Sequence, residues 1–151
     1  MARTYLAHIL IVRSAAASAD ASAQSMSEAR AAADKLVAMP RLQGLPLAML
    51  ALAYLNAGRP ARAQTTVDQA VAILADIPGH LDAGEALIRL AQARILDRTG
   101  QRARARTAIA AARDWVADRA RSIGNPRWSR CFIRNVPENA EILALAESWL
   151  S

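Results

Sequence analysis

Several residue types on which active sites and small stabilised domains depend are scarce in this chain of 151 residues. Its single cysteine, Cys131, excludes an intramolecular disulfide and suits a reducing cytosol. The two histidines, His8 and His80, lie far from that cysteine in the sequence, without the spacing of a metal site or of a catalytic nucleophile and its base. We therefore expect no metal, no cofactor and no catalytic residue, and predict that the protein is not an enzyme.

Long apolar runs are also missing, and none approaches the roughly 18 residues of a membrane-spanning helix. The start of the chain resembles a secretory signal, because Arg3 precedes an apolar segment over residues 5–12 and an Ala/Ser-rich tract follows. However, His8 interrupts the apolar segment and Arg13 ends it early, which favours a first helix of the fold. The expected location is the cytoplasm, without membrane contact.

Alanine dominates what is present, with 37 residues, whereas aromatic residues make up only 4% of the chain. Alanine is the best helix former, and strands favour β-branched and aromatic residues. The composition and length therefore predict one all-α domain over residues 1–151.

Two stretches, residues 47–75 and 89–117, align position for position when Gly58 is placed on Gly100. In the first stretch the small and apolar positions are Leu47, Leu50, Ala51, Tyr54, Gly58, Ala63, Val67 and Ala70. Their counterparts are Arg89, Gln92, Ala93, Leu96, Gly100, Ala105, Ile109 and Ala112. This pattern resembles the tetratricopeptide repeat, in which a glycine turn joins two helices and small residues let helices approach closely. The resemblance implies an α-α superhelix of helical hairpins.

The expected repeat units cover about residues 1–40, 45–77 and 81–121, followed by a capping segment over 126–150. In the first unit we predict a helix over 6–13, a loop over 14–25 and a helix over 27–39 that Pro40 stops. Helices over 47–57 and 60–75 form the second unit, and helices over 82–98 and 101–121 the third. A closing helix over 137–150 is predicted to start at a capping box of Asn135 and Glu138.

A more specific resemblance covers roughly residues 45–150 and is most specific in the last third of the chain. Its motifs are Gly84-Glu85-Ala86-Leu87, the Arg-rich helix after Gly100, residues 132–139 (FIRNVPEN) and Leu143-Ala144-Leu145-Ala146. They resemble the repeat-containing tail of large bacterial multidomain signalling proteins, notably serine/threonine kinases and ATPase-type regulators. No P-loop, kinase glycine loop or His-Arg-Asp triplet is present, so the resemblance implies only the role of such a tail, protein contacts and regulation.

The first helix of each tetratricopeptide unit lines a concave groove, and the resemblance maps its exposed positions onto this chain. They are Leu52, Leu55, Asn56, Leu87, Leu90, Arg94, Asp97 and Arg98. This lining suits an acidic or amphipathic peptide whose carboxylates or phosphates pair with Arg94 and Arg98. The competing interpretation is that neighbouring helices or a truncated partner cover Leu52, Leu87 and Leu90 and leave no open groove. We therefore predict a protein-interaction scaffold or regulatory module.

Charge suggests a second function. Residues 89–134 hold twelve arginines and three acids, a net charge of +9, whereas the rest of the chain carries −3. A basic helical-repeat protein that binds nucleic acid is therefore the alternative, if these arginines form one unpaired stripe rather than pairing with acids. The tryptophans are interpreted as core residues and Cys131 as a small buried residue, while Asp114 and Asp118 are expected to be solvated and charge-balanced.

Three questions stay open at this stage: the partner, the oligomeric state, and whether Met1 starts a small protein or a piece of a longer one. Leu6, Ile9 and Leu10 in an incomplete first unit would favour self-association if they were exposed.

Overall fold

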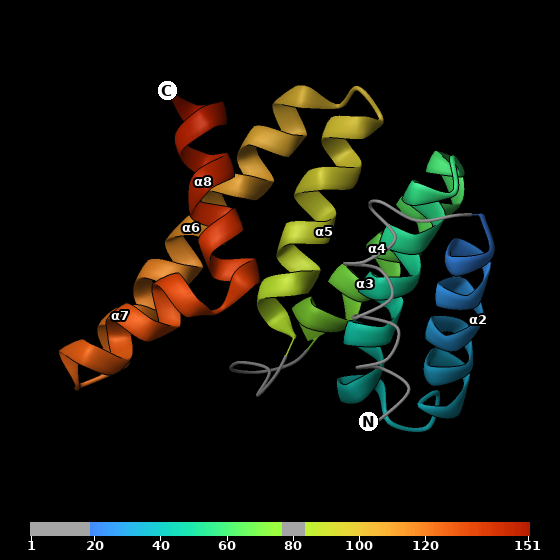
Figure 1. The fold of residues 1–151 in the computed structure, drawn as a ribbon, viewed down its shortest axis with the longest axis horizontal. Coiled ribbons are helices and arrows are strands. Elements are labelled where there is room, and N and C mark those ends of the chain that lie inside the picture. The colour runs from blue at the N-terminus through green and yellow to red at the C-terminus, as the bar shows by residue number, and fades with distance from the viewer. Residues whose placement is uncertain (1–18, 77–83) are drawn as a thin grey trace.

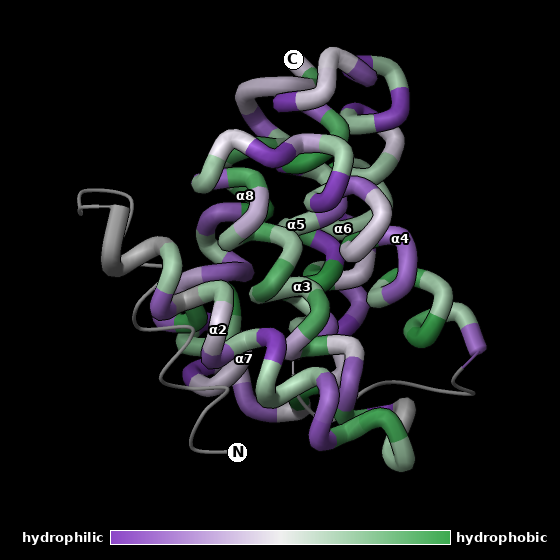
Figure 2. The backbone as a smooth tube through the Cα atoms, turned by 90° about the vertical axis from the view of Figure 1, so that its right-hand side faces the viewer, coloured by the Kyte–Doolittle hydropathy of each residue, from purple (hydrophilic) through white to green (hydrophobic). Residues whose placement is uncertain are grey.

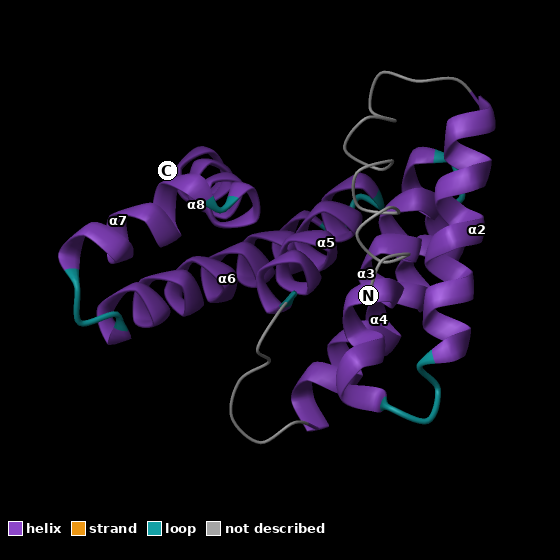
Figure 3. Ribbon diagram, turned by 60° about the horizontal axis from the view of Figure 1, so that its bottom comes forward, coloured by secondary structure: helices purple, strands orange, loops and turns teal. Residues whose placement is uncertain are grey.

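The computed structural model describes residues 19–76 and 84–151, and within these ranges it contains helices and no strand (Figure 3). The helices are α2 (Ala19–Lys35), α3 (Pro40–Asn56), α4 (Pro60–Asp76), α5 (Glu85–Arg98), α6 (Arg102–Ser122), α7 (Pro126–Asn135) and α8 (Pro137–Leu150). The predicted all-α class is therefore confirmed. The predicted helix over 6–13, the break at Pro78-Gly79 and both histidines lie outside the described residues.

Proline starts four of these helices: Pro40 in α3, Pro60 in α4, Pro126 in α7 and Pro137 in α8. The fixed φ of proline suits the first helical turn, where its missing N–H has no partner to lose. Proline is unfavourable further along a helix, because there it removes a hydrogen bond and clashes with the preceding turn. These four prolines therefore mark where helices start.

The turns at Gly58 and Gly100 have the same geometry. Both glycines have positive φ, 68° and 79°, which L-residues with a Cβ rarely adopt. In the first turn the Arg59 amide donates to the Tyr54 carbonyl at 2.9 Å, and in the second the Gln101 amide donates to the Leu96 carbonyl at 2.9 Å. This is the helix-ending pattern in which an αL glycine lets a later amide satisfy a carbonyl of the last turn. The two turns, whose glycines are 42 residues apart in the sequence, therefore have equivalent backbone hydrogen bonds.

α5 lies at the centre of the packing and contacts α3, α4, α6 and α8 (Figure 1). One hydrophobic cluster joins α2, α3, α4 and one side of α5, including Ile88 and Ile95. A second cluster joins the other side of α5, at Leu90 and Ala93, to α6 and α8. The hydrophobic turns of α3 lie near the middle of the molecule (Figure 2). Each helix pair therefore buries its apolar surface against the next one along the chain.

The start of the described chain differs from the prediction. Residues 19–25, expected to form part of a loop, belong to α2, and α2 ends at Lys35 instead of Met39. The alanines that alternate with serine here supply helix propensity, which outweighs the turn preference of serine.

α3 begins seven residues earlier than predicted, at Pro40, and continues through Gly44 and Pro46. Both residues were expected to mark a boundary. Gly44 is buried, and a Cβ on it would lie 3.1 Å from Cδ1 of Ile88, so its small size permits close approach of α3 and α5. Pro46 is also fully buried. Packing of these residues compensates for the helix-breaking tendency that the sequence alone displays.

The predicted capping box at the start of α8 is wrong, although the bounds of this helix are as predicted. Asn135 is the last residue of α7, and the residue that precedes α8 is Val136, which makes no side-chain cap. A residue in helical conformation cannot act as the N-cap of the next helix, because the cap needs an extended backbone.

Candidate functional site

The C-terminal half of α3, one side of α5 along its length and one side of α8 enclose a groove of about 530 Å³. All seven residues predicted for partner binding line it: Leu52, Asn56, Leu87, Leu90, Arg94, Asp97 and Arg98. The same groove is lined by Leu55 as predicted, by Met49, and by Pro137, Glu138, Glu141, Leu145 and Trp149 of α8. The structure therefore brings the predicted set together on one surface.

The apolar floor of this groove is less accessible than the sequence suggested. Leu52, Leu87 and Leu90 were expected to be exposed, but their exposed fractions are only 5%, 6% and 1%. They are buried because α5 packs on α3 and α8 packs on α5, so each leucine fills the space between adjacent helices. The competing interpretation is thus correct about burial, yet an open groove remains above these side chains.

Polar side chains at the ends of α3 and α5 form the rim. Asn56 and Arg98 are exposed, and Asp97 is half-buried. Within the described residues Arg98 forms no ion pair, so its guanidinium keeps its five donors for an external group.

Arg94 does not fit the prediction of a side chain reserved for a partner. Its guanidinium forms an ion pair with the Glu141 carboxylate of α8, and both side chains are partly exposed. Sequence reasoning missed Glu141 because it lies 47 residues after Arg94 and belongs to a helix interpreted only as a cap. A carboxylate of any ligand at this position would have to compete with the internal one.

The contribution of α8 also changes the charge of the groove. Glu138 and Glu141 join Asp97, so the lining holds three carboxylates and two guanidiniums. In the sequence, the only sign that α8 lines the groove is the apolar stripe of Ile142, Leu145 and Trp149. That stripe predicts packing against the core and does not predict a wall of the site. In the structure Ile142 is buried, whereas Leu145 and Trp149 are half-buried beside the groove.

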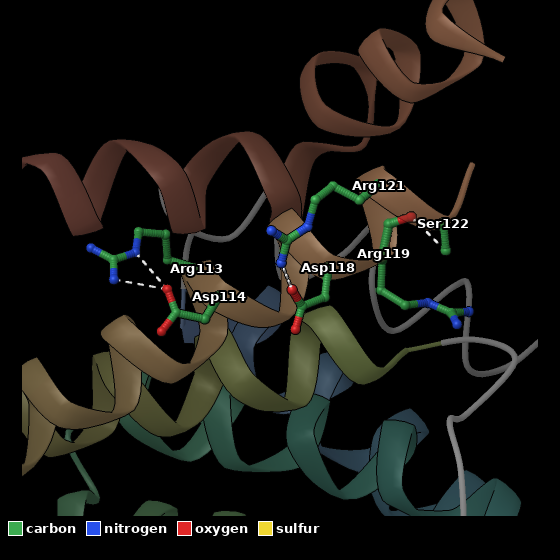
Figure 4. Close-up of polar contacts among 6 residues, drawn as sticks. All are labelled: Arg113, Asp114, Asp118, Arg119, Arg121 and Ser122. Carbon is green, nitrogen blue, oxygen red and sulfur yellow. Dashed lines mark hydrogen bonds and ion pairs between the residues drawn. The ribbon is translucent and has the colours of Figure 1, made fainter. Parts of the chain in front are cut away.

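The arginines of the basic half do not form one stripe. Those with partners are Arg89 with Glu85, Arg94 with Glu141, Arg104 with Gln101, Arg113 with Asp114 and Arg121 with Asp118. Figure 4 shows the ion pairs of Asp114 and Asp118 along α6. Both carboxylates are exposed, at 64% and 65%, which confirms that these acids are solvated and charge-balanced. Intramolecular ion pairs thus neutralise part of the positive charge of the arginines over residues 94–134.

Two residues of α7 differ from the sequence prediction. Cys131, expected to be buried, is exposed, and Trp128, expected to pack in the core, is 69% exposed. Both fall on the side of a short helix that has no neighbour to cover it, since α7 contains no buried residue.

The other tryptophans do pack. Trp115 lies 6.4 Å from Phe132, centroid to centroid, and the Arg89 guanidinium stands 5.7 Å from the Trp115 ring centroid. Trp149 packs against the second hydrophobic cluster.

A second cavity, of about 610 Å³, lies between α2, α3 and α4. Arg30 donates a hydrogen bond to the Tyr54 hydroxyl at 3.3 Å, and the Arg62 guanidinium lies 5.9 Å from the ring centroid of the same tyrosine. Both arginines are therefore held by Tyr54, and no predicted site residue lines this cavity.

Among the described residues, no group of three or more His, Cys, Asp or Glu side chains is placed to hold a metal ion. None of the helices within residues 19–76 and 84–151 is long and apolar enough to cross a bilayer. Comparisons with protein-family models, with curated proteins and with solved structures found no match to this chain. The groove and the surface charges are therefore the features of the molecule that indicate a function.

Proposed function

We propose that this protein is a non-enzymatic interaction module of tetratricopeptide-like architecture that binds a peptide segment of another protein in the groove between α3, α5 and α8. The observation that carries the proposal is the convergence of all seven predicted residues on one groove. Recognition would combine an apolar floor with a charged rim, as in other peptide-binding grooves.

The helix contacts support the array architecture. α3 pairs with α4 and α5 with α6, and α5 contacts both helices of the preceding pair. α8 contacts α5 and α6 in the same manner, so it occupies the place of the first helix of a further unit. In such an array the first helices line the concave side, and here those helices are α3, α5 and α8.

The rim favours a ligand that has an apolar side chain and a nearby carboxylate or phosphate. Leu145 and Trp149 are half-buried and have surface left to cover, while Arg98 supplies a charged donor that forms no ion pair with the residues the structure describes. A charge-assisted hydrogen bond to Arg98 fixes the direction of the peptide, and the apolar contact supplies affinity.

The test starts from peptides selected out of a random dodecapeptide display library against the whole chain. Binding of the selected peptides is then measured by fluorescence anisotropy for the wild type, for Arg98→Glu and for Arg102→Glu. Arg102 is exposed, lies four residues further on and does not line the groove, so it is the matched charge control. We expect Arg98→Glu to weaken binding about tenfold or more and Arg102→Glu to leave it unchanged.

The variant Glu141→Gln gives a test of opposite sign. It releases Arg94 from its internal ion pair, so a selected peptide with a carboxylate should bind more tightly. Equal loss of binding in both arginine variants, or selection that enriches no peptide, would refute the proposed groove function.

A further inference from the structure

The end of α6 and the whole of α7 carry positive charge without any acid. Between Asp118 and Glu138 the sequence contains five arginines, Arg119, Arg121, Arg127, Arg130 and Arg134, and neither aspartate nor glutamate. α7 lies at the end of the molecule opposite α2 (Figures 1 and 3). None of its residues lines the peptide groove, so this surface is independent of the function proposed above.

The three arginines of α7 share one face of the helix. Arg127, Arg130 and Arg134 are spaced three and four residues apart, which places them on one side of an α-helix. All three are exposed, and none forms an ion pair among the described residues. Phe132 is half-buried on another side of the helix and faces Trp115. The arginine face is therefore directed away from the core.

The fold does not account for Arg127 and Trp128. Arg127 lies in the first turn of α7, where the helix dipole disfavours a cation. Trp128 follows it and is 69% exposed, although a tryptophan normally gains stability by burying its large ring. Some arginines elsewhere in the basic half, such as Arg94 and Arg113, have carboxylate partners, whereas Arg98, like the arginines of α7, forms no ion pair among the described residues. The fold leaves the Arg127 guanidinium and the Trp128 indole uncovered about 100° apart around the helix axis, so an anionic, aromatic ligand that wraps around α7 can contact both.

We propose that α7 binds single-stranded nucleic acid, with Arg127, Arg130 and Arg134 on the phosphates and Trp128 stacked on an unpaired base. Guanidinium groups bind phosphates with several donors at once, and exposed aromatic rings stack on bases without sequence preference. An acidic protein segment would match the charge but not the exposed indole. Duplex DNA offers phosphates, but its bases are already stacked on one another.

The experiment measures binding of fluorescein-labelled single-stranded RNA and DNA of about 15 nucleotides to the whole chain, over a series of salt concentrations. The test variant is Arg127→Ala/Arg130→Ala/Arg134→Ala. Its matched control is Arg102→Ala/Arg104→Ala/Arg106→Ala, which removes the same charge from exposed positions of α6. Circular dichroism checks that both triple variants retain their helix content.

For the α7 variant we expect the slope of log affinity against log salt to fall by about two, because each phosphate contact on a single strand contributes about 0.7. We expect Trp128→Ala to lose roughly tenfold in affinity with an unchanged slope, since it removes stacking and no charge. The α6 control should retain wild-type affinity.

Several outcomes would overturn the proposal. Equal losses in the two triple variants would mean that general charge, not α7, governs binding. Wild-type affinity in Trp128→Ala, or tighter binding of duplex than of single strands, would show that Trp128 does not stack on an unpaired base. Binding to polyglutamate or to anionic vesicles but not to oligonucleotides would identify a different class of partner.

Discussion

At the residue scale, glycine positions with positive φ show how much one side chain can change this fold. Gly58 and Gly84 have φ of 68° and 86°. A Cβ on Gly58 would meet nothing within 4 Å, whereas a Cβ on Gly84 would lie 2.9 Å from both Cβ and Cδ1 of Leu45. The first glycine serves only a turn, and the second also permits contact between the start of α5 and α3.

The variants Gly58→Ala and Gly84→Ala should therefore differ in stability. We expect a loss of about 1 kcal/mol for Gly58→Ala, from the left-handed backbone alone. For Gly84→Ala we expect about 3 kcal/mol, because the clash with Leu45 adds to the same backbone cost. Urea denaturation followed by circular dichroism measures both values. Equal losses would contradict the close contact at Gly84.

The Arg94–Glu141 ion pair gives a second prediction at this scale. The side chains are 43% and 33% exposed, so water and salt screen their attraction. In a double-mutant cycle with Arg94→Gln and Glu141→Gln we expect a coupling free energy of about 0.5 kcal/mol. It should decrease further in about 0.5 M salt. A coupling of several kcal/mol would mean that the pair locks the groove and that a peptide carboxylate cannot displace it.

At the scale of single elements, the helix ends follow local rules in some places and tertiary packing in others. α7 has a cap from Asn125, whose Oδ1 accepts hydrogen bonds from the amides of Arg127 at 2.9 Å and Trp128 at 3.3 Å. Asn135 does not cap α8, although its spacing to Glu138 resembles a capping box. The same residue type therefore has different roles at the two ends of α7.

We expect Asn125→Ala to destabilise α7 by about 1 kcal/mol, since two backbone donors lose their acceptor. Asn135→Ala is the matched control and should change stability by less than about 0.5 kcal/mol. Hydrogen exchange of the amides in α7 detects the local effect directly, as a roughly fivefold loss of protection for Asn125→Ala. A larger effect of Asn135→Ala than of Asn125→Ala would show that Asn135 does cap α8.

At the scale of the whole molecule, α5 connects two hydrophobic clusters. Ile88 and Ile95 belong to the first cluster and Leu90 and Ala93 to the second. In a stack of helix pairs, stability is approximately the sum of the units and their interfaces, and a shared helix couples the units. The two halves of the described structure should therefore unfold together.

The tryptophans make this cooperativity measurable, because Trp115, Trp128 and Trp149 all lie in the second half, whereas circular dichroism reports on every helix. We expect coincident urea transitions from both signals, in the wild type and in Ile142→Ala. Ile142 is fully buried, so its truncation should cost about 3 kcal/mol. Fluorescence that changes at lower urea than circular dichroism would show that α2–α4 persist without the second cluster.

The sequence by itself determined the all-α class, the turns at Gly58 and Gly100, and the bounds of α8. These features depend on local chemistry: the helix propensity of alanine, the positive φ of glycine and the preference of proline for a first turn. The predicted groove residues also came together, because helical periodicity and the 42-residue offset already place them on equivalent faces of α3 and α5.

Only the tertiary structure decided how accessible those residues are and what else surrounds them. The burial of Leu90 and the pairing of Arg94 depend on α8, which is more than 40 residues away in sequence. The passage of α3 through Pro46, and the exposure of Trp128 and Cys131, likewise depend on which surfaces have a neighbour. Local propensity reports what one segment prefers, whereas burial and ion pairing are properties of two segments in contact.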